Sequence, residues 1–596
     1  MNGEQMTERE LASVTTAVAE AVRRAVRDVA PGAGDPDPLV RPSTFADLQA
    51  NVALPLGKRL RRAPLEVAEE IAAGLREDPG VVAAVEVSGP GFLNLTVADA
   101  ELWHRVAARL ADDDRLGVPR SRLGERTVID YSAPNIAKEM HVGHLRTTII
   151  GDCLARVLDH LGADVVRQNH LGDWGTQFGM LIQYLDEHPD RPWHARDLQG
   201  GDGVPALDAL YREARAAFDA DPAFAERARA RVVALQAGHE ATLRTWRAIV
   251  AESERTFDAL YRRLGVLLTL DDSFGESFYN PWLPDVVREL EDAGIAVESE
   301  GALCVFDPDV TGPDGDPVPL IVRKSDGGFG YDATDLATLR YRLRELKANR
   351  LLYVVDSRQA QHFRLVFAAG RRAGWVPDDV EVRHVGFGTV LGPDGRPFRT
   401  RAGATVRLGD LLDDAVERAR AVIAEKNPEL PPAELDALAE TVGIASVKYA
   451  ELATSRTKDY VFDVSRMVSF TGDTGAYLQY AHARVRSILR RAEPGLLAEP
   501  AIEVAVTPEP AERALILLLD AFGDRLAEVG ETCEPHRLCG YLYDLARAFT
   551  DFYEACPVLG AATDAQRGNR LALCRLTAAT LRQGLGLLGV NAPDRL

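Results

Sequence analysis

The clearest pattern of apolar and polar positions begins near residue 127, where an apolar extended run predicts a buried strand. Leucine and isoleucine then recur at helical spacing from Leu145 to Leu161, which predicts a long helix after a turn. Strand-like runs that alternate with helical patterns continue along the chain, at residues 164–169, 351–355 and 381–387. This alternation indicates an α/β fold with a doubly wound parallel sheet of the Rossmann type.

The regions on either side of this alternation have different patterns. Before it, helical patterns lead into two strand-like runs, 81–87 and 92–97, with a Gly-Pro-Gly turn between them, which predicts a hairpin. After residue 432 the pattern is almost wholly helical to the end. We therefore expect an N-terminal α/β domain, a catalytic sheet domain with a helical insertion at about 207–264, and an all-α C-terminal domain, at residues 1–120, 121–431 and 432–596.

Length and composition agree with a multidomain globular protein. The chain has 596 residues, whereas single cores seldom grow beyond about 250–300 residues. No run of about 18 uncharged apolar residues predicts a membrane span, and the first ten residues do not resemble a secretory signal. We therefore expect a cytoplasmic protein without a membrane partner.

The six cysteines are scattered, which favours reduced core thiols in a cytosolic protein over a disulfide framework. Cys533, His536 and Cys539 lie close in sequence, but a fourth ligand is not evident, so no dedicated metal site is expected.

The net charge of −21 argues against indiscriminate binding to nucleic acids, which are held mainly by Lys and Arg. It leaves room for a specific RNA partner that meets a local basic face. Residues 441–491 carry more basic than acidic side chains, although a solvated helix face would look the same.

The motif His141-x-Gly143-His144 stands where the first strand turns into its helix. Free N–H groups in the first turn of a helix attract anions, and Gly143 lets an anion approach closely. Both imidazoles could donate hydrogen bonds to phosphate oxygens. The alternative is two surface histidines beside a helix cap. The motif alone does not decide between these interpretations.

Polar residues gather at four predicted strand ends, and in a doubly wound sheet the ligand lies at this edge. They are found at residues 131–135, at 169–175 with Trp174 over a tight turn, at 358–362 including His362, and from 386 onwards. Convergence at four strand ends is hard to explain by core packing. The sequence therefore predicts a nucleotide site there.

A second candidate phosphate-binding segment is the Gly- and Pro-rich loop 391–403, which places Arg396, Arg399 and Arg401 on one flexible segment. A solvated charge cluster is the alternative. Farther upstream, Tyr331 and Asp335 are four residues apart, so a helix start would put both on one face. A carboxylate there could pair with a guanidinium through two hydrogen bonds, although a capped helix with a supporting tyrosine would look alike.

Residues 467–487 interleave aromatic and basic side chains, a mixture that suits stacking on unpaired RNA bases. Tyr477, Tyr480 and Arg484 lie at helical spacing and could equally be core and rim, and for at least one tyrosine we favour the core.

The run from Ser132 to Arg146, Ser-x-Pro-Asn-Ile-Ala-Lys-x-Met-His-x-Gly-His-Leu-Arg, resembles the first signature of class I aminoacyl-tRNA synthetases in its arginyl form. Phe398-Arg-Thr-Arg401 resembles a degenerate form of the second signature, with Arg399 where lysine is usual. Arg and Lys meet phosphate differently, so the contact of Arg399 stays open. The resemblance extends from about residue 51 to residue 596.

The resemblance implies the site residues. Enzymes of this branch that lack the second signature's final lysine carry one before the first signature, and Lys138 stands there. The expected ATP site comprises Lys138, His141, Gly143, His144, His362, Arg399, Thr400 and Arg401. The expected arginine site comprises Asp130, Ser132, Asn135, Tyr331, Asp335 and Gln359. The expected tRNA contacts are Asn94 with the D-loop and Tyr477 and Arg484 at the anticodon.

The resemblance also implies a reaction: arginine is activated as an adenylate with ATP and Mg²⁺, and then transferred to tRNA(Arg). It implies a monomer whose arginine activation requires bound tRNA. Two alternatives remain. A small-molecule nucleotidyltransferase shares the histidine motif but is usually shorter and lacks a helical C-terminal third. A tRNA-binding paralogue without catalysis would be expected to have lost Lys138, His141 or His144, and all three are present.

Overall fold

A computed structural model describes residues 12–32, 34–77, 80–194, 203–312, 314–392, 394–398, 406–492 and 502–596. The chain packs as two compact units. The first comprises residues 1–121, 469–587 and 591–596, and the second comprises residues 122–468 and 588–590. The domain boundaries expected near residues 120 and 431 stay predictions, because compact packing alone does not define a domain. Within the described ranges, no helix combines the length and apolarity needed to cross a membrane.

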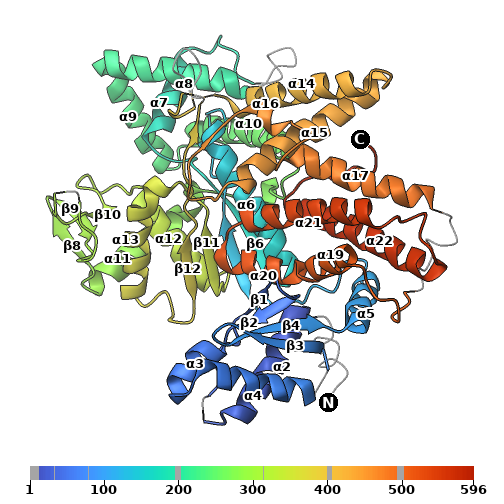
Figure 1. The fold of residues 1–596 in the computed structure, drawn as a ribbon. Helices are drawn as coiled ribbons and strands as arrows, with labels where there is room; N and C mark the ends of the chain where they lie inside the picture. Colours follow the sequence, from blue (N-terminus) through green and yellow to red (C-terminus); the bar gives the residue numbers. More distant parts are fainter. Residues whose placement is uncertain are drawn as a thin grey trace. The chain divides into compact units, whose positions relative to one another are not determined.

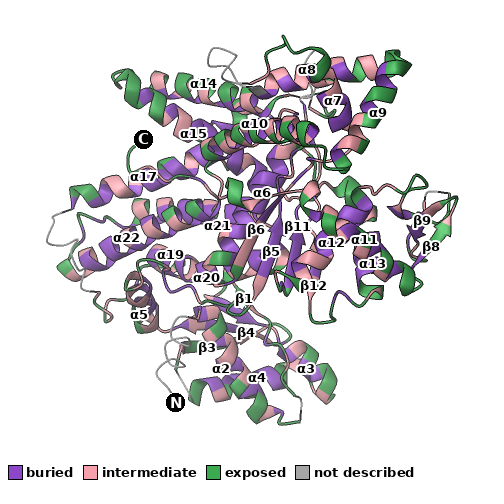
Figure 2. Ribbon diagram, turned by 180° about the vertical axis from the view of Figure 1, so that it is seen from behind, coloured by how far each residue is buried: buried purple, intermediate pink, exposed green. Residues whose placement is uncertain are grey.

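The second unit contains a five-stranded parallel sheet in the order β12-β11-β5-β6-β7, of which Figure 1 labels β12, β11 and β6. The central strands are largely buried (Figure 2), as expected for a parallel sheet flanked by helices. The strands that follow β5 in the sequence lie on both sides of it, with β6 and β7 on one side and β11 and β12 on the other. The strand order therefore reverses between β5 and β11. A doubly wound sheet places its ligand at this point. The strands are β5 (Arg126–Asp130), β6 (Asp164–Leu171), β7 (Ser273–Gly275), β11 (Arg350–Tyr353) and β12 (Glu381–His384).

All four strands that the sequence predicted in this region belong to this one sheet, with ends that differ by one to three residues. The parallel α/β fold class is therefore confirmed. Strand β7 was not predicted, because three residues are too few to show a period.

Helices surround the sheet and continue beyond it. The helical stretch expected at 207–264 consists of three helices, and α15 packs on α14 within this unit. The α-helices are α6 (Val142–His160), α7 (Thr176–Glu187), α8 (Gly203–Ala220), α9 (Pro222–Gln236), α10 (Glu240–Leu264), α11 (Leu283–Asp292), α12 (Tyr331–Arg344), α13 (Ala360–Arg372), α14 (Leu408–Lys426), α15 (Pro432–Ala453) and α16 (Val464–Met467).

Short elements complete the second unit. The antiparallel sheet β10-β9-β8 precedes α12, and β13 pairs with β14. The 3₁₀ helices are η2 (Leu270–Asp272), η3 (Glu276–Trp282) and η4 (Ser357–Gln359). The small strands are β8 (Ala296–Ser299), β9 (Ala302–Val305), β10 (Leu320–Arg323), β13 (Val390–Leu391) and β14 (Tyr460–Val461).

The first unit joins an antiparallel sheet to a set of helices. The sheet has the order β1-β2-β4-β3 and contains the predicted hairpin of β3 and β4. Helices from the end of the chain pack on α5, and the buried Arg109 of α5 binds Asp520 of α19 at 2.8 Å. The elements are α2 (Val14–Val29), β1 (Val40–Pro42), β2 (Leu48–Ala50), α3 (Ala53–Leu60), α4 (Pro64–Glu77), β3 (Val82–Ser88), β4 (Phe92–Val97), α5 (Asp99–Leu110), α17 (Gly475–Arg491), α19 (Pro510–Asp520), α20 (Phe522–Thr532), α21 (His536–Ala555) and α22 (Asp564–Leu587).

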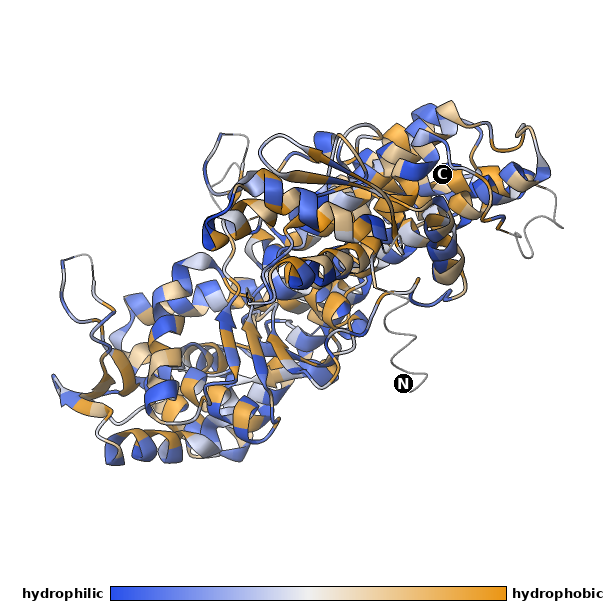
Figure 3. Cartoon of the chain, turned by 60° about the horizontal axis from the view of Figure 1, so that its bottom comes forward, coloured by the Kyte–Doolittle hydropathy of each residue, from blue (hydrophilic) through white to orange (hydrophobic). Residues whose placement is uncertain are grey.

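Many helices of both units have one apolar and one polar face (Figure 3). In α2, for example, Val14, Val18, Val22 and Val26 recur every fourth residue and are buried. Ser13 precedes this helix and its hydroxyl accepts a hydrogen bond from the Thr16 N–H, which caps the helix start. Amphipathic spacing and capping together explain why the helices expected from the sequence form here.

Candidate active site

The loop after β5 has a backbone that is unusual for residues with a Cβ atom. Ser132, Ala133 and Ala137 have φ angles of +77°, +49° and +61°. The left-handed region costs such a residue about 1–2 kcal/mol, and it persists only where the surroundings fix it. The Thr147 hydroxyl accepts from the Ser132 N–H at 3.0 Å, and the Asn169 amide oxygen accepts from the Ala133 N–H at 2.9 Å. The loop is therefore fixed by side chains from α6 and β6.

The loop leads into the start of α6, where the two motif histidines cap the helix. Nδ1 of His141 accepts from the Gly143 N–H at 3.0 Å, and Nδ1 of His144 accepts from the His141 N–H at 3.1 Å. Because each Nδ1 is an acceptor, the neutral ring carries its proton on Nε2. Both rings can therefore donate from Nε2 to an anion at the helix start. Both histidines cap the helix, as the alternative interpretation proposed, but their rings are half-buried, and the tautomers suit the phosphate interpretation.

Both imidazoles are held in the neutral form. Burial lowers the pKa of His144 to about 3, and repulsion from Lys138, and from His141 once that ring is protonated at low pH, adds to this effect. Burial and the Lys138 ammonium also lower the pKa of His141. Lys138 Nζ lies 4.9 Å from the ring centroid of Tyr211 on α8. The start of α6 thus carries one lysine charge and two neutral donors.

Gly143 has a structural role besides leaving room for an anion. A Cβ atom at this position would lie 2.8 Å from Cε1 and 2.9 Å from Nδ1 of His141. Real Cβ contacts are almost never this short, so a larger residue would displace the His141 ring. The motif needs glycine at position 143 because the His141 ring, which caps the helix, folds back over that residue.

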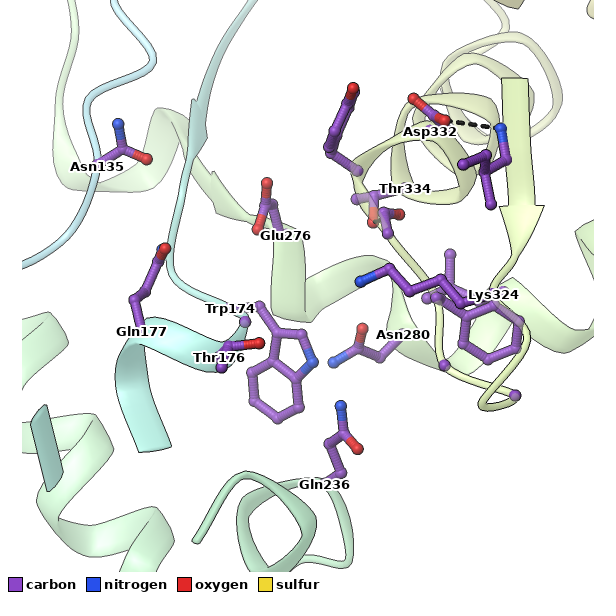
Figure 4. Close-up of a pocket in the computed structure, with 18 residues that line it drawn as sticks. Asn135, Trp174, Thr176, Gln177, Gln236, Glu276, Asn280, Lys324, Asp332 and Thr334 are labelled. Atoms are coloured by element: carbon purple, nitrogen blue, oxygen red, sulfur yellow. Dashed lines mark hydrogen bonds between the residues drawn. The ribbon is translucent and has the colours of Figure 1, made fainter. Parts of the chain in front are cut away.

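A cleft of about 590 Å³ lies beside this loop in the second unit. Asn135 from the loop after β5 and Tyr331 from the start of α12 both line it, and both belong to the set that was predicted for arginine. Figure 4 shows Glu276 and Lys324 reaching into it from different segments, with the Trp174 ring between β6 and α7. The remaining lining residues are Gly175, Thr176, Gln177, Gln236, Asn280, Leu283, Ile321, Gly327, Gly328, Phe329, Gly330, Asp332 and Thr334.

Glu276 is a half-buried carboxyl group whose charge depends on what the cleft holds. Burial raises its pKa to about 8, and the negative charges of Asp173 and Asp335 add to this effect. Asp173 is itself buried and accepts from the Ser277 N–H at 2.8 Å and from the Ser277 hydroxyl at 2.5 Å. A positive group in the cleft would favour the ionised form of Glu276. A guanidinium has this charge and could form two hydrogen bonds to one carboxylate.

His362, which we expected at the ATP site, binds the two aspartates of α12. Its Nε2 lies 2.6 Å from Asp335 Oδ2, and its Nδ1 lies 3.3 Å from Asp332 Oδ1. Burial opposes a charge on this ring, but the two carboxylates outweigh it and raise the pKa of His362 to about 9. The Tyr331 ring centroid lies 5.3 Å from that of His362. His362 therefore belongs with the acidic residues predicted for arginine.

The predicted arginine site also included Asp130, Ser132 and Gln359. The first two contact other side chains, and the third is exposed. Asp130 is buried, and its Oδ2 accepts from Arg342 Nη2 at 2.7 Å, while its Oδ1 has no hydrogen-bond partner among the described residues. The buried Ser132 hydroxyl lies 2.7 Å from the hydroxyl of Tyr261. Gln359 is exposed in η4, directly after β11.

Arg399, Thr400 and Arg401 lie outside the described residues, so the predicted second phosphate loop is described only up to Phe398. Arg396, before it, donates its backbone N–H to Asp394 Oδ1 at 3.1 Å.

The residues predicted to bind tRNA lie in the first unit. Arg484 stacks over the Tyr553 ring at 5.1 Å, and the half-buried Tyr477 lies 5.7 Å from Tyr543, whereas Tyr480 is exposed. Asn94 is buried and uses its amide within the domain, donating to Ser88 Oγ at 2.9 Å and accepting from Gln49 Nε2 at 2.9 Å. A base contact through Asn94 would have to replace one of these bonds.

Sequence reasoning missed Glu276, Lys324 and Arg342. Glu276 follows β7, which is too short to be recognised, so its place at a strand end was hidden. Lys324 lies six residues before a glycine-rich helix start whose spacing points only to Tyr331 and Asp335. Arg342 is on the same helix as these two, but its partner Asp130 is 212 residues away.

Comparison with protein families and with solved structures gives a consistent result. Residues 105–464 match the family described as tRNA synthetases class I (R), catalytic domain. Residues 13–97 match an arginyl tRNA synthetase N terminal domain, and residues 478–596 match a DALR anticodon binding domain.

Individual proteins match over almost the whole chain. The arginine–tRNA ligase of Frankia casuarinae is 65% identical over 593 residues, which cover 99% of this chain and 100% of that one. The crystal structure of Plasmodium falciparum arginyl-tRNA synthetase has a TM-score of 0.80 at 28% identity and covers 98% of this chain and 99% of that one. The Thermus thermophilus arginyl-tRNA synthetase has a TM-score of 0.78 at 27% identity and covers 98% and 100%.

Proposed function

Because the chain belongs to the arginyl-tRNA synthetases, a class I tRNA synthetase family, we propose that it joins arginine to tRNA(Arg) in two steps that consume ATP. The observation that carries the proposal is the acidic cleft around Glu276, which shares the loop after β5 with the histidine cap of α6. The family argues against the small-molecule nucleotidyltransferase alternative.

Arginine occupies the cleft in this proposal. Its guanidinium pairs with Glu276 and Asp335, and Tyr331 lies beside it at the helix start. Gln359 is a further expected contact of the side chain. Asn135, with Ser132 and Asp130 as further expected contacts, holds the amino and carboxyl ends. The raised pKa of Glu276, about 8 in the free protein, supports a binding step that releases a proton as the guanidinium arrives.

ATP lies at the start of α6 with its Mg²⁺. An arginine carboxylate oxygen attacks the α-phosphorus, the new C–O–P link forms, and the bond to pyrophosphate breaks. Lys138 and the Nε2–H groups of His141 and His144 stabilise the negative charge that develops on the phosphate oxygens. In the second step a terminal ribose hydroxyl of tRNA attacks the arginyl carbonyl carbon, AMP leaves, and the hydroxyl proton is lost. No protein nucleophile is needed.

The tRNA contacts belong to the first unit. The aromatic and basic cluster of Tyr477, Tyr543, Arg484 and Tyr553 supports an anticodon contact, and the sheet that carries Asn94 supports a D-loop contact. We further propose three domains with the boundaries expected from the sequence, and a monomeric, cytoplasmic enzyme that requires tRNA to activate arginine.

ATP–pyrophosphate exchange tests the proposal when each amino acid is assayed with and without total tRNA. Exchange with arginine alone, and only when tRNA is present, is the expected result. Exchange with a different amino acid would refute the specificity. A chain that binds tRNA without any exchange would be the catalytically inactive paralogue.

A further inference from the structure

Helix α10 sends two buried hydroxyl groups to the strained loop after β5. Ser253 Oγ accepts from the Ala137 N–H at 3.0 Å, and the Tyr261 hydroxyl lies 2.7 Å from Ser132 Oγ. Ser253 is 0% exposed and Tyr261 is 2% exposed. Each hydroxyl reaches a residue whose φ angle is positive. Helix α10 therefore holds the loop at both of its ends.

The Tyr261 contact belongs to a buried cluster of hydroxyl groups. Thr148 Oγ1 lies 2.7 Å from the His144 carbonyl and 2.9 Å from Ser132 Oγ, and its one proton faces both acceptors. The Ser132 oxygen has two lone pairs, so it can accept from Tyr261 as well as from Thr148.

The other end of this cluster fixes the proton of Tyr261. Asn169 Nδ2 donates to the Tyr261 oxygen at 3.1 Å, so the tyrosine hydroxyl donates onward to Ser132. Burial raises the pKa of Tyr261, which keeps this proton in place. Removal of the hydroxyl would leave the Asn169 Nδ2 donor without this acceptor and would leave Ser132 Oγ with Thr148 alone of its two hydroxyl partners.

Ser253 acts at the other end of the loop. Its hydroxyl donates to the Ile249 carbonyl at 3.0 Å within α10 and accepts from Ala137, the residue before Lys138. Both bonding capacities of the hydroxyl are thus used in a buried position. Removal of it would leave the Ala137 N–H unpaired and would release the backbone that carries Lys138.

We infer that Tyr261 and Ser253 are positioning residues that hold the loop after β5 in its left-handed conformation, Tyr261 for the arginine contacts and Ser253 for Lys138. The inference rests on the proposed function, since it assigns the two ends of the loop to the two substrates of adenylate formation.

Two conservative variants test the two ends of the loop after β5 separately. The assay is ATP–pyrophosphate exchange with tRNA present. Tyr261→Phe is expected to raise the KM for arginine about tenfold and to leave the KM for ATP within about twofold. Ser253→Ala is expected to lower kcat or raise the KM for ATP about tenfold, with the KM for arginine nearly unchanged. A general loss of folded protein would lower the concentration of active enzyme. It would not raise the KM for one substrate while leaving the KM for the other unchanged.

Matched controls remove hydroxyls elsewhere in the second unit. Tyr184→Phe removes a hydroxyl that binds Glu213, and Ser446→Ala removes a buried hydroxyl without a partner among the described residues. If Tyr261→Phe and Ser253→Ala behave like these controls, or change both KM values equally, the inference is wrong. If Tyr261→Phe does not fold, Thr148→Val breaks the same cluster from α6 and must raise the KM for arginine.

Hydrogen exchange of the peptide at residues 131–140 separates this inference from the proposed function, because it needs no substrate. Both variants are expected to exchange at least about tenfold faster there than the controls, while peptides of β11 keep the exchange rate of the unmodified protein. Equal exchange in variants and controls would overturn the inference. If the unmodified protein shows no arginine-dependent pyrophosphate exchange, the proposed function is wrong. The positioning role is then decided by hydrogen exchange alone.

Discussion

Two helices of the second unit begin with histidines at the same edge of the sheet, and their charge states are opposite. At the start of α6, His141 and His144 are neutral because burial and Lys138 lower their pKa values. At the start of α13, His362 is protonated near neutral pH because Asp332 and Asp335 raise its pKa to about 9 against the effect of burial. The residue type and the topological position are shared, so the neighbours alone set the difference.

The difference divides the site by charge. The α6 start offers a lysine and two Nε2–H donors, which suit phosphate oxygens, and it contributes no carboxylate of its own to that cap. The α13 start adds a cation to a group of acids: His362 partly offsets the negative charges of Asp332 and Asp335, and Asp332 lines the cleft together with Glu276. In our account, one side therefore binds the triphosphate and the other binds the guanidinium.

The largest effect is expected on the phosphate side. Lys138→Ala should slow pyrophosphate exchange by roughly 30- to 1,000-fold, or about 2–4 kcal/mol, because a charge that stabilises the transition state is lost. Exchange at saturating arginine and ATP measures it, with the exposed Lys347→Ala as the matched control. An unchanged rate would show that Lys138 takes no part in the mechanism. The proposed difference in function between the starts of α6 and α13 would then be lost.

On the acidic side, Glu276→Gln should raise the KM for arginine by roughly tenfold to a hundredfold and leave the KM for ATP nearly unchanged, because a buried charged hydrogen bond contributes about 1.5–3 kcal/mol. Asp335→Asn should act in the same direction. The arginine KM of the unmodified protein should also fall as the pH rises toward 8, and this dependence should weaken in Glu276→Gln. Glu298→Gln, on the exposed edge of β8, is the control. Equal changes in both KM values would contradict the assignment.

The smallest effect is on stability, and its sign differs between the two helix starts. The raised pKa of His362 means that its ion pairs stabilise the fold fully below about pH 6.5, and that this contribution is lost as the pH rises toward about 9. The lowered pKa of His144 means that its contribution is complete above about pH 6.5 and is lost as the pH falls toward about 3.

Melting temperatures of His362→Gln and His144→Asn, measured against the unmodified protein from pH 5 to 9.5, test both signs. The difference for His362→Gln should shrink at alkaline pH, and that for His144→Asn should shrink at acid pH. Parallel curves for the two variants would show that the two helix starts do not differ in charge.

The sequence predicted the part of this site that depends on local pattern. Apolar runs revealed β5, β6, β11 and β12, and the histidine motif revealed the α6 start, because these signals lie within about 20 residues. His362 was predicted for the ATP site from its place after a strand, but its contact with Asp335 was not predicted, since Asp335 lies 27 residues upstream on another helix. Glu276 was missed because a three-residue strand shows no period. Charge state and pairing depend on contacts between distant segments, which pattern alone does not reveal.

A structure of the protein bound to a non-hydrolysable arginyl-adenylate analogue tests the division of the site most directly. The account predicts guanidinium nitrogens within about 3.2 Å of carboxylate oxygens of Glu276 and Asp335, and α-phosphate oxygens at hydrogen-bond distance from Nε2 of His141 or His144. A guanidinium bound outside the cleft, or a phosphate remote from the start of α6, would contradict it.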